Sequence, residues 1–208
     1  MKEYKMFAQR VGLVGLTNFV NSFQGVILLP ILTKNMSVAD YGMWAQIMVT
    51  IGLIPSLMSL GLLQSMVRFM PSAKNREYFQ DMFYSFLSVI TITSIFASLA
   101  IYFMSGVVAD LLFGGDKLIV EILALVVFFE GVRKVLLNYF RATQQIKKHS
   151  ILNMAKNIFV VIMVAFFVLQ GEGIFGAVKG LLIATIIVVI INLFLIVHDL
   201  GLKIPQFN

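Results

Sequence analysis

Long apolar runs dominate this sequence, and they constrain its fold more than any other feature. A helix needs about 20 apolar residues to cross the hydrocarbon core of a bilayer. Runs of that length recur along the whole chain and predict six transmembrane helices, at about residues 11–32, 42–63, 82–104, 118–140, 151–169 and 177–197. Short loops join them, so residues 1–208 are predicted to form one all-α, polytopic membrane helix bundle.

The composition excludes a soluble globule and a disordered chain. Of 208 residues, 60% are hydrophobic and 12% are charged, about half the charged share of an ordinary soluble domain. A disordered chain needs low hydrophobicity and high net charge. Cysteine is absent and the two histidines, His149 and His198, lie far apart in sequence. We therefore expect no cofactor, no thiolate chemistry and no metal site.

Basic residues are unevenly distributed over the expected loops. The net charge is +6, and ten Lys or Arg fall on the side of the two termini, against two in the loops of the opposite side. The ten are Lys2, Lys5, Arg10, Arg68, Lys74, Arg76, Arg141, Lys147, Lys148 and Lys203, and the two are Lys34 and Lys117. The positive-inside rule then places both termini in the cytoplasm of a multi-pass cell-membrane protein. We expect membrane lipid, and no nucleic acid, as a partner.

Polar side chains follow one face of each of the first two spans. At 100° per residue, Arg10, Thr17, Asn21 and Gln24 fall within a narrow arc of the first span, facing either protein or water. Pro55 interrupts the hydrogen-bond ladder of the second span and predicts a kink. A polar seam is predicted along that span, at Gln46, Thr50, Gly61, Gln64 and Arg68. The amides of the first span serve equally well as interhelical hydrogen bonds or as ligand contacts.

The fourth and fifth spans carry charges inside their apolar runs. Glu130, Arg133 and Lys134 have the spacing i, i+3, i+4, which places them on one helix face, and Lys156 and Asn157 lie at a similar depth in the fifth span. Each ionised residue near a helix centre costs about 2.5 to 3.5 kcal/mol in lipid, so these groups need partners or water. Glu130, Arg133, Lys134 and Lys156 sum to a formal +2. A cavity lined by them attracts a phosphate or pyrophosphate group.

Structural explanations stay open for each of these charges. Lys156 lies about five residues from the cytoplasmic edge of its span and can reach the interface by snorkelling. Glu130 can serve only to neutralise a neighbouring cation.

Three segments carry the sequence motifs of a known family. The stretch Leu28 to Ala45, LLPILTKNMSVADYGMWA, is followed by Ser59 to Pro71, SLGLLQSMVRFMP, and by Tyr139 to Leu152, YFRATQQIKKHSIL. In this order they resemble the polysaccharide-export and Wzx-type oligosaccharide flippases. The resemblance covers the chain as the amino-terminal half of a family member.

The resemblance implies a fold and an activity. It places the chain in the multidrug, oligosaccharidyl-lipid and polysaccharide exporter superfamily, whose members pair two six-helix bundles around a V-shaped cavity. The implied activity moves a polyprenyl-phosphate-linked or polyprenyl-pyrophosphate-linked oligosaccharide to the outer leaflet. Arg10, Arg133, Lys134 and Lys156 are then the candidates for holding the phosphate. Because one bundle has no opposing wall, the chain is expected to be a fragment or to associate with a second bundle, as a copy or as a separate chain.

The sequence also allows functions other than that of a flippase. An ion-coupled exporter of small molecules would use Glu130 as a protonation site. A nonfunctional fragment would need a second bundle before it could act. A membrane-embedded enzyme is not expected, because Asp110 and Asp116 lie in an outer loop with no His or Cys nearby.

Overall fold

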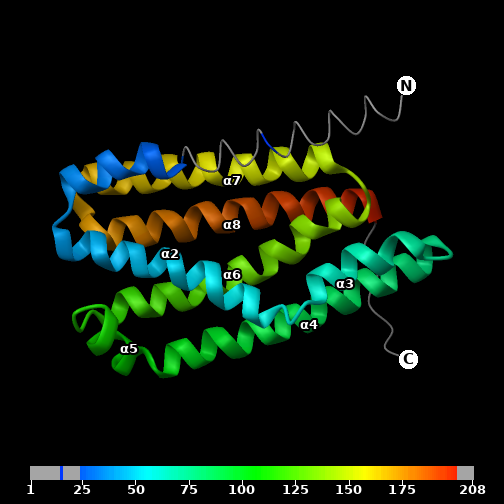
Figure 1. Ribbon diagram of the computed structural model, residues 1–208, viewed down its shortest axis with the longest axis horizontal. Helices are drawn as coiled ribbons and strands as arrows, with labels where there is room; N and C mark the ends of the chain where they lie inside the picture. The colour runs from blue at the N-terminus through cyan, green and yellow to red at the C-terminus, as the bar shows by residue number, and fades with distance from the viewer. Residues whose placement is uncertain (1–14, 16–23, 201–208) are drawn as a thin grey trace.

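The architecture is that of an all-helical bundle. The computed structural model describes residue 15 and residues 24–200, and no strand occurs in that part of the chain (Figure 1). A helix over residues 24–35 precedes the others. The elements that follow are α2 (Val38–Met58), α3 (Leu62–Phe69), η1 (Met70–Ser72), α4 (Arg76–Phe103), α5 (Ser105–Leu112), α6 (Lys117–Ala142), α7 (Ile146–Phe167), η2 (Val168–Glu172) and α8 (Gly173–Leu200). The prediction of an all-α fold is confirmed for the described residues.

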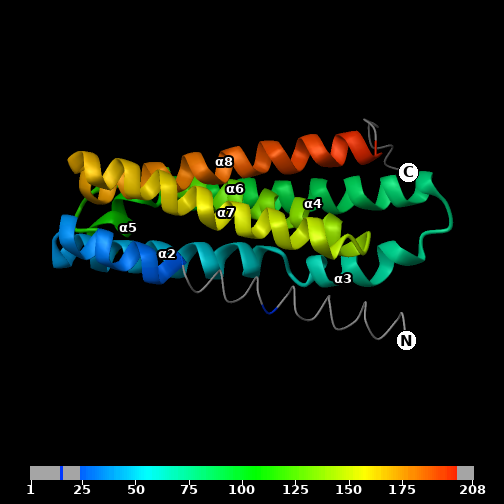
Figure 2. The same cartoon turned by 90° about the horizontal axis from the view of Figure 1, so that it is seen from above.

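The long helices run side by side between two ends of the bundle (Figures 1 and 2). The α3–α4 turn, the α6–α7 turn and the end of α8 lie at one end, on the right in Figure 1. We call this the basic end, because its turns and helix ends carry Lys74, Arg76, Arg141, Lys147 and Lys148. The opposite end holds α5 and the α7–α8 connection. The structure thus brings together the loops that the sequence assigned to one side of the membrane, while the cytoplasmic position of that side stays a prediction.

Three stretches of the described residues are long and apolar enough to cross a membrane. They are Val38–Met58, Arg76–Phe103 and the 55-residue stretch Ile146–Leu200. The last stretch contains both α7 and α8, which reverse direction where Gly171 and Gly173 adopt φ values of 85° and 54°. Helix α6 has 26 residues but carries the charges of Glu130, Arg133 and Lys134. A membrane protein is supported, and the count of six spans stays a prediction.

The second span is divided more sharply than a proline kink would divide it. Helix α2 ends at Met58, and Leu60 and Gly61 then adopt φ values of 44° and 78°, the left-handed region. Pro55 has no N–H to donate and lies in the last turn of α2. In place of the kinked helix predicted over residues 42–63, a left-handed turn follows Pro55 and a new helix begins at Leu62. The predicted polar seam is divided at the same turn.

Polar side chains cap the N-termini of α2, α4 and α6. Ser37 and Asp40 form a reciprocal capping box at the start of α2. The Asn75 side chain accepts from the backbone N–H of Tyr78 at 2.7 Å, and Asp116 accepts from that of Ile119 at 3.4 Å. These bonds satisfy N–H groups that lack intrahelical partners. Helix α5 lies in the region predicted as an outer loop and was not expected from the sequence.

Helix α6 lies at the centre of the bundle, and this position determines the environment of its charges. It contacts α2, α3, α4, α5, α7 and α8. Gly131 permits close approach of α4, because a Cβ there would collide with the Ser94 hydroxyl. Gly180 permits close approach of α7, because a Cβ there would lie 2.7 Å from the Met163 backbone. Charged residues on the inner faces of α6 are therefore surrounded by protein rather than lipid.

Candidate functional site

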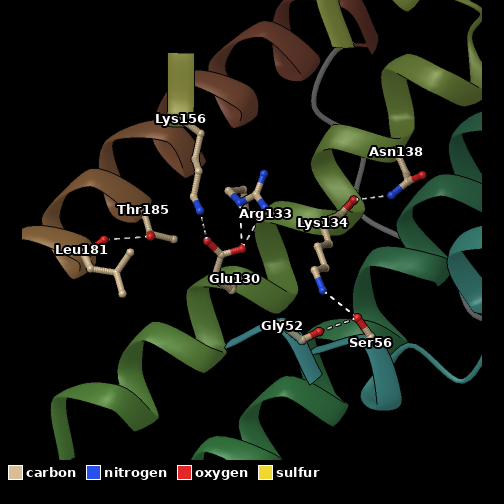
Figure 3. Close-up of polar contacts among 9 residues, drawn as sticks. All are labelled: Gly52, Ser56, Glu130, Arg133, Lys134, Asn138, Lys156, Leu181 and Thr185. Atoms are coloured by element: carbon tan, nitrogen blue, oxygen red, sulfur yellow. Dashed lines mark hydrogen bonds and ion pairs between the residues drawn. The ribbon is translucent and has the colours of Figure 1, made fainter. Parts of the chain in front are cut away.

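Glu130 and Arg133 form a buried ion pair on α6 (Figure 3). One carboxylate oxygen of Glu130, Oε2, accepts from Arg133 Nε at 2.9 Å and lies 2.8 Å from Nη2. The side chains are 3% and 9% exposed. The spacing i, i+3 places both on one helix face, so the pairing predicted between them is found.

Lys156 joins this pair from the neighbouring helix α7. Its Nζ lies 3.3 Å from Glu130 Oε1, and its side chain is 12% exposed. Figure 3 shows the lysine and the arginine approaching the same carboxylate from different directions. The carboxylate therefore links α6 to α7, and Lys156 extends inward rather than snorkelling to the interface. We call Glu130, Arg133 and Lys156 the ionic cluster.

Lys134 faces a different helix. Its Nζ donates to the Ser56 hydroxyl of α2 at 2.9 Å, and that hydroxyl donates to the Gly52 carbonyl at 2.7 Å. The predicted trio on α6 is thus divided: Arg133 turns to Glu130, while Lys134 reaches α2 across the bundle (Figure 3). Lys134 is half-buried. The backbone carbonyl of Lys134 also accepts from Asn138 Nδ2 at 2.8 Å.

The electrostatics of this region favour an anion. One carboxylate faces two cations in the ionic cluster, and Lys134 adds a third, for the formal +2 that the sequence predicts. Arg133 Nη1 is buried and has no hydrogen-bond partner among the described residues. Burying charge without compensation is costly, so these donors suit an anionic group with several acceptor oxygens.

The other predicted site residues are distributed elsewhere or lie outside the described residues. Asn157 is buried beside Lys156 on α7. Gln24 lines a separate hollow of about 450 Å³, together with Tyr41 and Trp44. Arg10 and Asn21 lie outside the described residues. The assignment of Gln24 and Asn157 to one substrate cavity stays a prediction.

Sequence reasoning missed two polar residues, the exposed Ser56 and the buried Asn192. Ser56 was not singled out, although it follows Pro55 and is the partner of Lys134. Asn192 of α8 is fully buried, and neither its amide nitrogen nor its amide oxygen has a partner among the described residues. The signal for Asn192 was present, because it is a lone amide inside a long apolar run.

Two carboxylates of the opposite end have structural partners. Asp116 caps α6, and Glu121 pairs with Lys117 at 3.5 Å. Within residue 15 and residues 24–200, no group of three or more His, Cys, Asp or Glu residues is placed to hold a metal ion.

The fold and the ionic cluster define the class of this chain as a membrane-type helical protein with buried cations in its interior. A family model described as polysaccharide biosynthesis protein matches residues 7–208, and the chain belongs to that family. The resemblance drawn from the three sequence segments is confirmed by this match. Neither the search of curated proteins nor the search of solved structures found a match.

Proposed function

We propose that this chain is a transporter, not an enzyme, and that it moves a polyprenyl-phosphate-linked or polyprenyl-pyrophosphate-linked oligosaccharide across the cell membrane. The family membership and the apolar helices support a transport role in polysaccharide biosynthesis. The lipid-linked substrate is supported by the chemistry of the interior.

The observation that carries the proposal is the excess of cations around Glu130. Arg133 and Lys156 share this one carboxylate, and Lys134 lies on the same turn of α6. Phosphate oxygens can replace the carboxylate as acceptors, because charge-assisted hydrogen bonds from Arg and Lys are among the strong ones. We infer that a headgroup phosphate binds by competing with Glu130 for these donors.

Transport requires a second wall opposite the cluster, which we propose is another six-helix bundle. Either a second copy or a separate chain can supply it. Binding of the headgroup by this chain does not depend on that partner, so binding and movement can be measured separately.

The test begins with binding of a labelled polyprenyl-pyrophosphate oligosaccharide to the purified chain. Lys156→Met removes a cation of the cluster, and Lys117→Met removes an exposed cation at the opposite end as a control. Losing a hydrogen bond to a charged group costs about 1.5 to 3 kcal/mol, so we expect binding to weaken by about 10-fold or more in the first variant alone. Equal binding by both variants would exclude the cluster as the phosphate site.

Movement is then measured in proteoliposomes by leaflet-specific detection of the same substrate. We expect Arg133→Ala and Glu130→Ala to abolish movement above that of empty vesicles. Normal movement in both variants would contradict the site. A pH dependence of transport that Glu130→Gln removes would instead identify an ion-coupled exporter.

A further inference from the structure

A hollow opens at the basic end, away from the ionic cluster. It measures about 540 Å³ and lies between the α3–α4 turn and the α6–α7 turn, since residues of both line it. Its lining includes Met70, Ala73, Arg76, Phe79 and Gln144. None of the residues proposed to hold the transported substrate belongs to this lining.

The lining is apolar on one part and polar on another. Ala73 and Phe79 are half-buried and Pro71 is exposed, and together they give the hollow an apolar wall. Arg76 and Gln144 are exposed and supply polar groups at its edge. A ligand that matches both parts combines a polar headgroup with an apolar body.

Arg76 gives the polar part its charge. Its Nη2 donates to the backbone carbonyl of Asp199 at 3.1 Å and lies 3.5 Å from that of Leu200. A guanidinium has five N–H donors in all, so the same side chain can hold the end of α8 and also donate toward the hollow. Lys74 and Arg141 lie next in sequence to residues that line it.

The charges around the hollow sum to a cationic field. Among the described residues, six cations lie at this end, Arg68, Lys74, Arg76, Arg141, Lys147 and Lys148, against the carboxylates of Glu77, Asp81 and Asp199. Asp199 is paired with Lys148 at 3.1 Å. The formal excess of these six cations over three carboxylates favours an anionic ligand.

The position of the hollow indicates which class of anionic ligand it can bind. It lies at the ends of helices that include two membrane-length stretches, beginning at Arg76 and at Ile146, and hence at the expected boundary between water and lipid. Basic pockets at that depth are suited to lipid headgroups. We propose that this hollow binds the phosphate of an anionic phospholipid, with the lipid body against the apolar wall.

The test is retention of lipid by the purified 208-residue chain, measured by native mass spectrometry after exchange into phosphatidylglycerol or phosphatidylcholine. We expect phosphatidylglycerol to be retained preferentially and to raise the thermal unfolding midpoint. A basic residue near a membrane surface contributes about 1 kcal/mol, so Arg76→Gln is expected to lower retention roughly fivefold. Lys117→Gln, at the opposite end, is the control and should leave retention unchanged.

A second variant distinguishes a specific lipid site from nonspecific electrostatic attraction of anionic lipid. Ala73→Trp fills the hollow and leaves the charge unaltered, so a specific site predicts loss of retention with the cations intact. This variant leaves the hydrogen bond from Arg76 to the end of α8 intact, so its result does not depend on whether Arg76→Gln destabilises that helix. Normal retention by Ala73→Trp, or equal retention of the two lipids, would overturn the proposal. Stabilisation by millimolar inorganic phosphate equal to that by phosphatidylglycerol would identify free phosphate, and not lipid, as the ligand.

Discussion

Glu130 links two helices through opposite charges in the protein interior. Its carboxylate is shared by Arg133 of its own helix and Lys156 of α7, and all three side chains are largely buried. A buried ion pair often contributes little compared with an apolar replacement, yet removing one partner leaves the others uncompensated. The cluster therefore makes the structure sensitive to loss of its single carboxylate.

Glu130→Ala is expected to destabilise the protein by about 3 to 5 kcal/mol, because two cations would then remain buried without an acceptor. The measurement is the free energy of unfolding in mixed detergent micelles. Glu121→Ala is the matched control on the same helix, since the Lys117–Glu121 pair is partly exposed. Exposed pairs contribute about 0.2 to 1 kcal/mol. Equal losses in the free energy of unfolding for the two substitutions would show that water or another ion compensates the charges of Arg133 and Lys156.

At the residue scale, the sequence predicts contacts within a helix better than contacts between helices. The spacing of Glu130 and Arg133 was enough to predict their pairing. The partner of Lys156 was not predictable, because its contact with Glu130 depends on how α7 is positioned against α6. For the same reason the contact of Lys134 with Ser56 of α2 was not foreseen.

Close approach of α7 and α8 depends on small residues at their contact. The Cβ of an alanine at position 180 would lie 2.7 Å from backbone atoms of Met163 and 2.8 Å from the nitrogen of Val164. Backbone atoms cannot rotate away as side-chain atoms can, so the helices themselves would have to separate. Small residues at such crossings let membrane helices pack by van der Waals contact.

Gly180→Ala is accordingly expected to destabilise the protein by about 1 to 3 kcal/mol, although alanine favours a helix. Gly52→Ala is the control, because a Cβ at position 52 of α2 meets nothing within 4 Å. That change should be neutral or stabilise by up to about 1 kcal/mol. Thermal unfolding of the two variants in one detergent compares them directly. A stable Gly180→Ala variant would mean that α7 and α8 are less closely packed than the structure shows.

At the element scale, apolar runs predicted where the long helices lie, but not where the chain breaks them. Helix α4 begins at Arg76, six residues before the predicted span, and α8 begins at Gly173, four residues before its span. The extension of α4, Arg76 to Asp81, is rich in polar residues, and a hydropathy window detects only the part of a helix that matches lipid. The extension of α8 begins at the glycines that follow the α7–α8 connection. The break at Leu60 and Gly61 was missed, because the apolar run continues through it.

On the scale of the whole molecule, the two ends of the bundle differ in charge. Lys74 lies in the α3–α4 turn and Lys147 at the start of α7, both at the basic end, whereas Lys117 begins α6 at the end that holds α5. The positive-inside rule assigns the basic end to the cytoplasm. The structure places the basic turns and the start of α6 at opposite ends of the bundle, and the membrane orientation stays a prediction from the charge.

The absence of native cysteine allows that orientation to be measured with single reporters. We expect Lys74→Cys and Lys147→Cys to react with a membrane-impermeant thiol reagent only when the cytoplasmic face is open, and Lys117→Cys to react in intact cells. The two positions at the basic end test each other. Because they lie at the same end of the bundle, both cysteines must react from the same face of the membrane, whichever face that is. Reaction of Lys74→Cys and Lys147→Cys from opposite faces would contradict the arrangement of helices. Reaction of both from outside would keep the fold and invert the topology, which would place the hollow beside Arg76 in the outer leaflet.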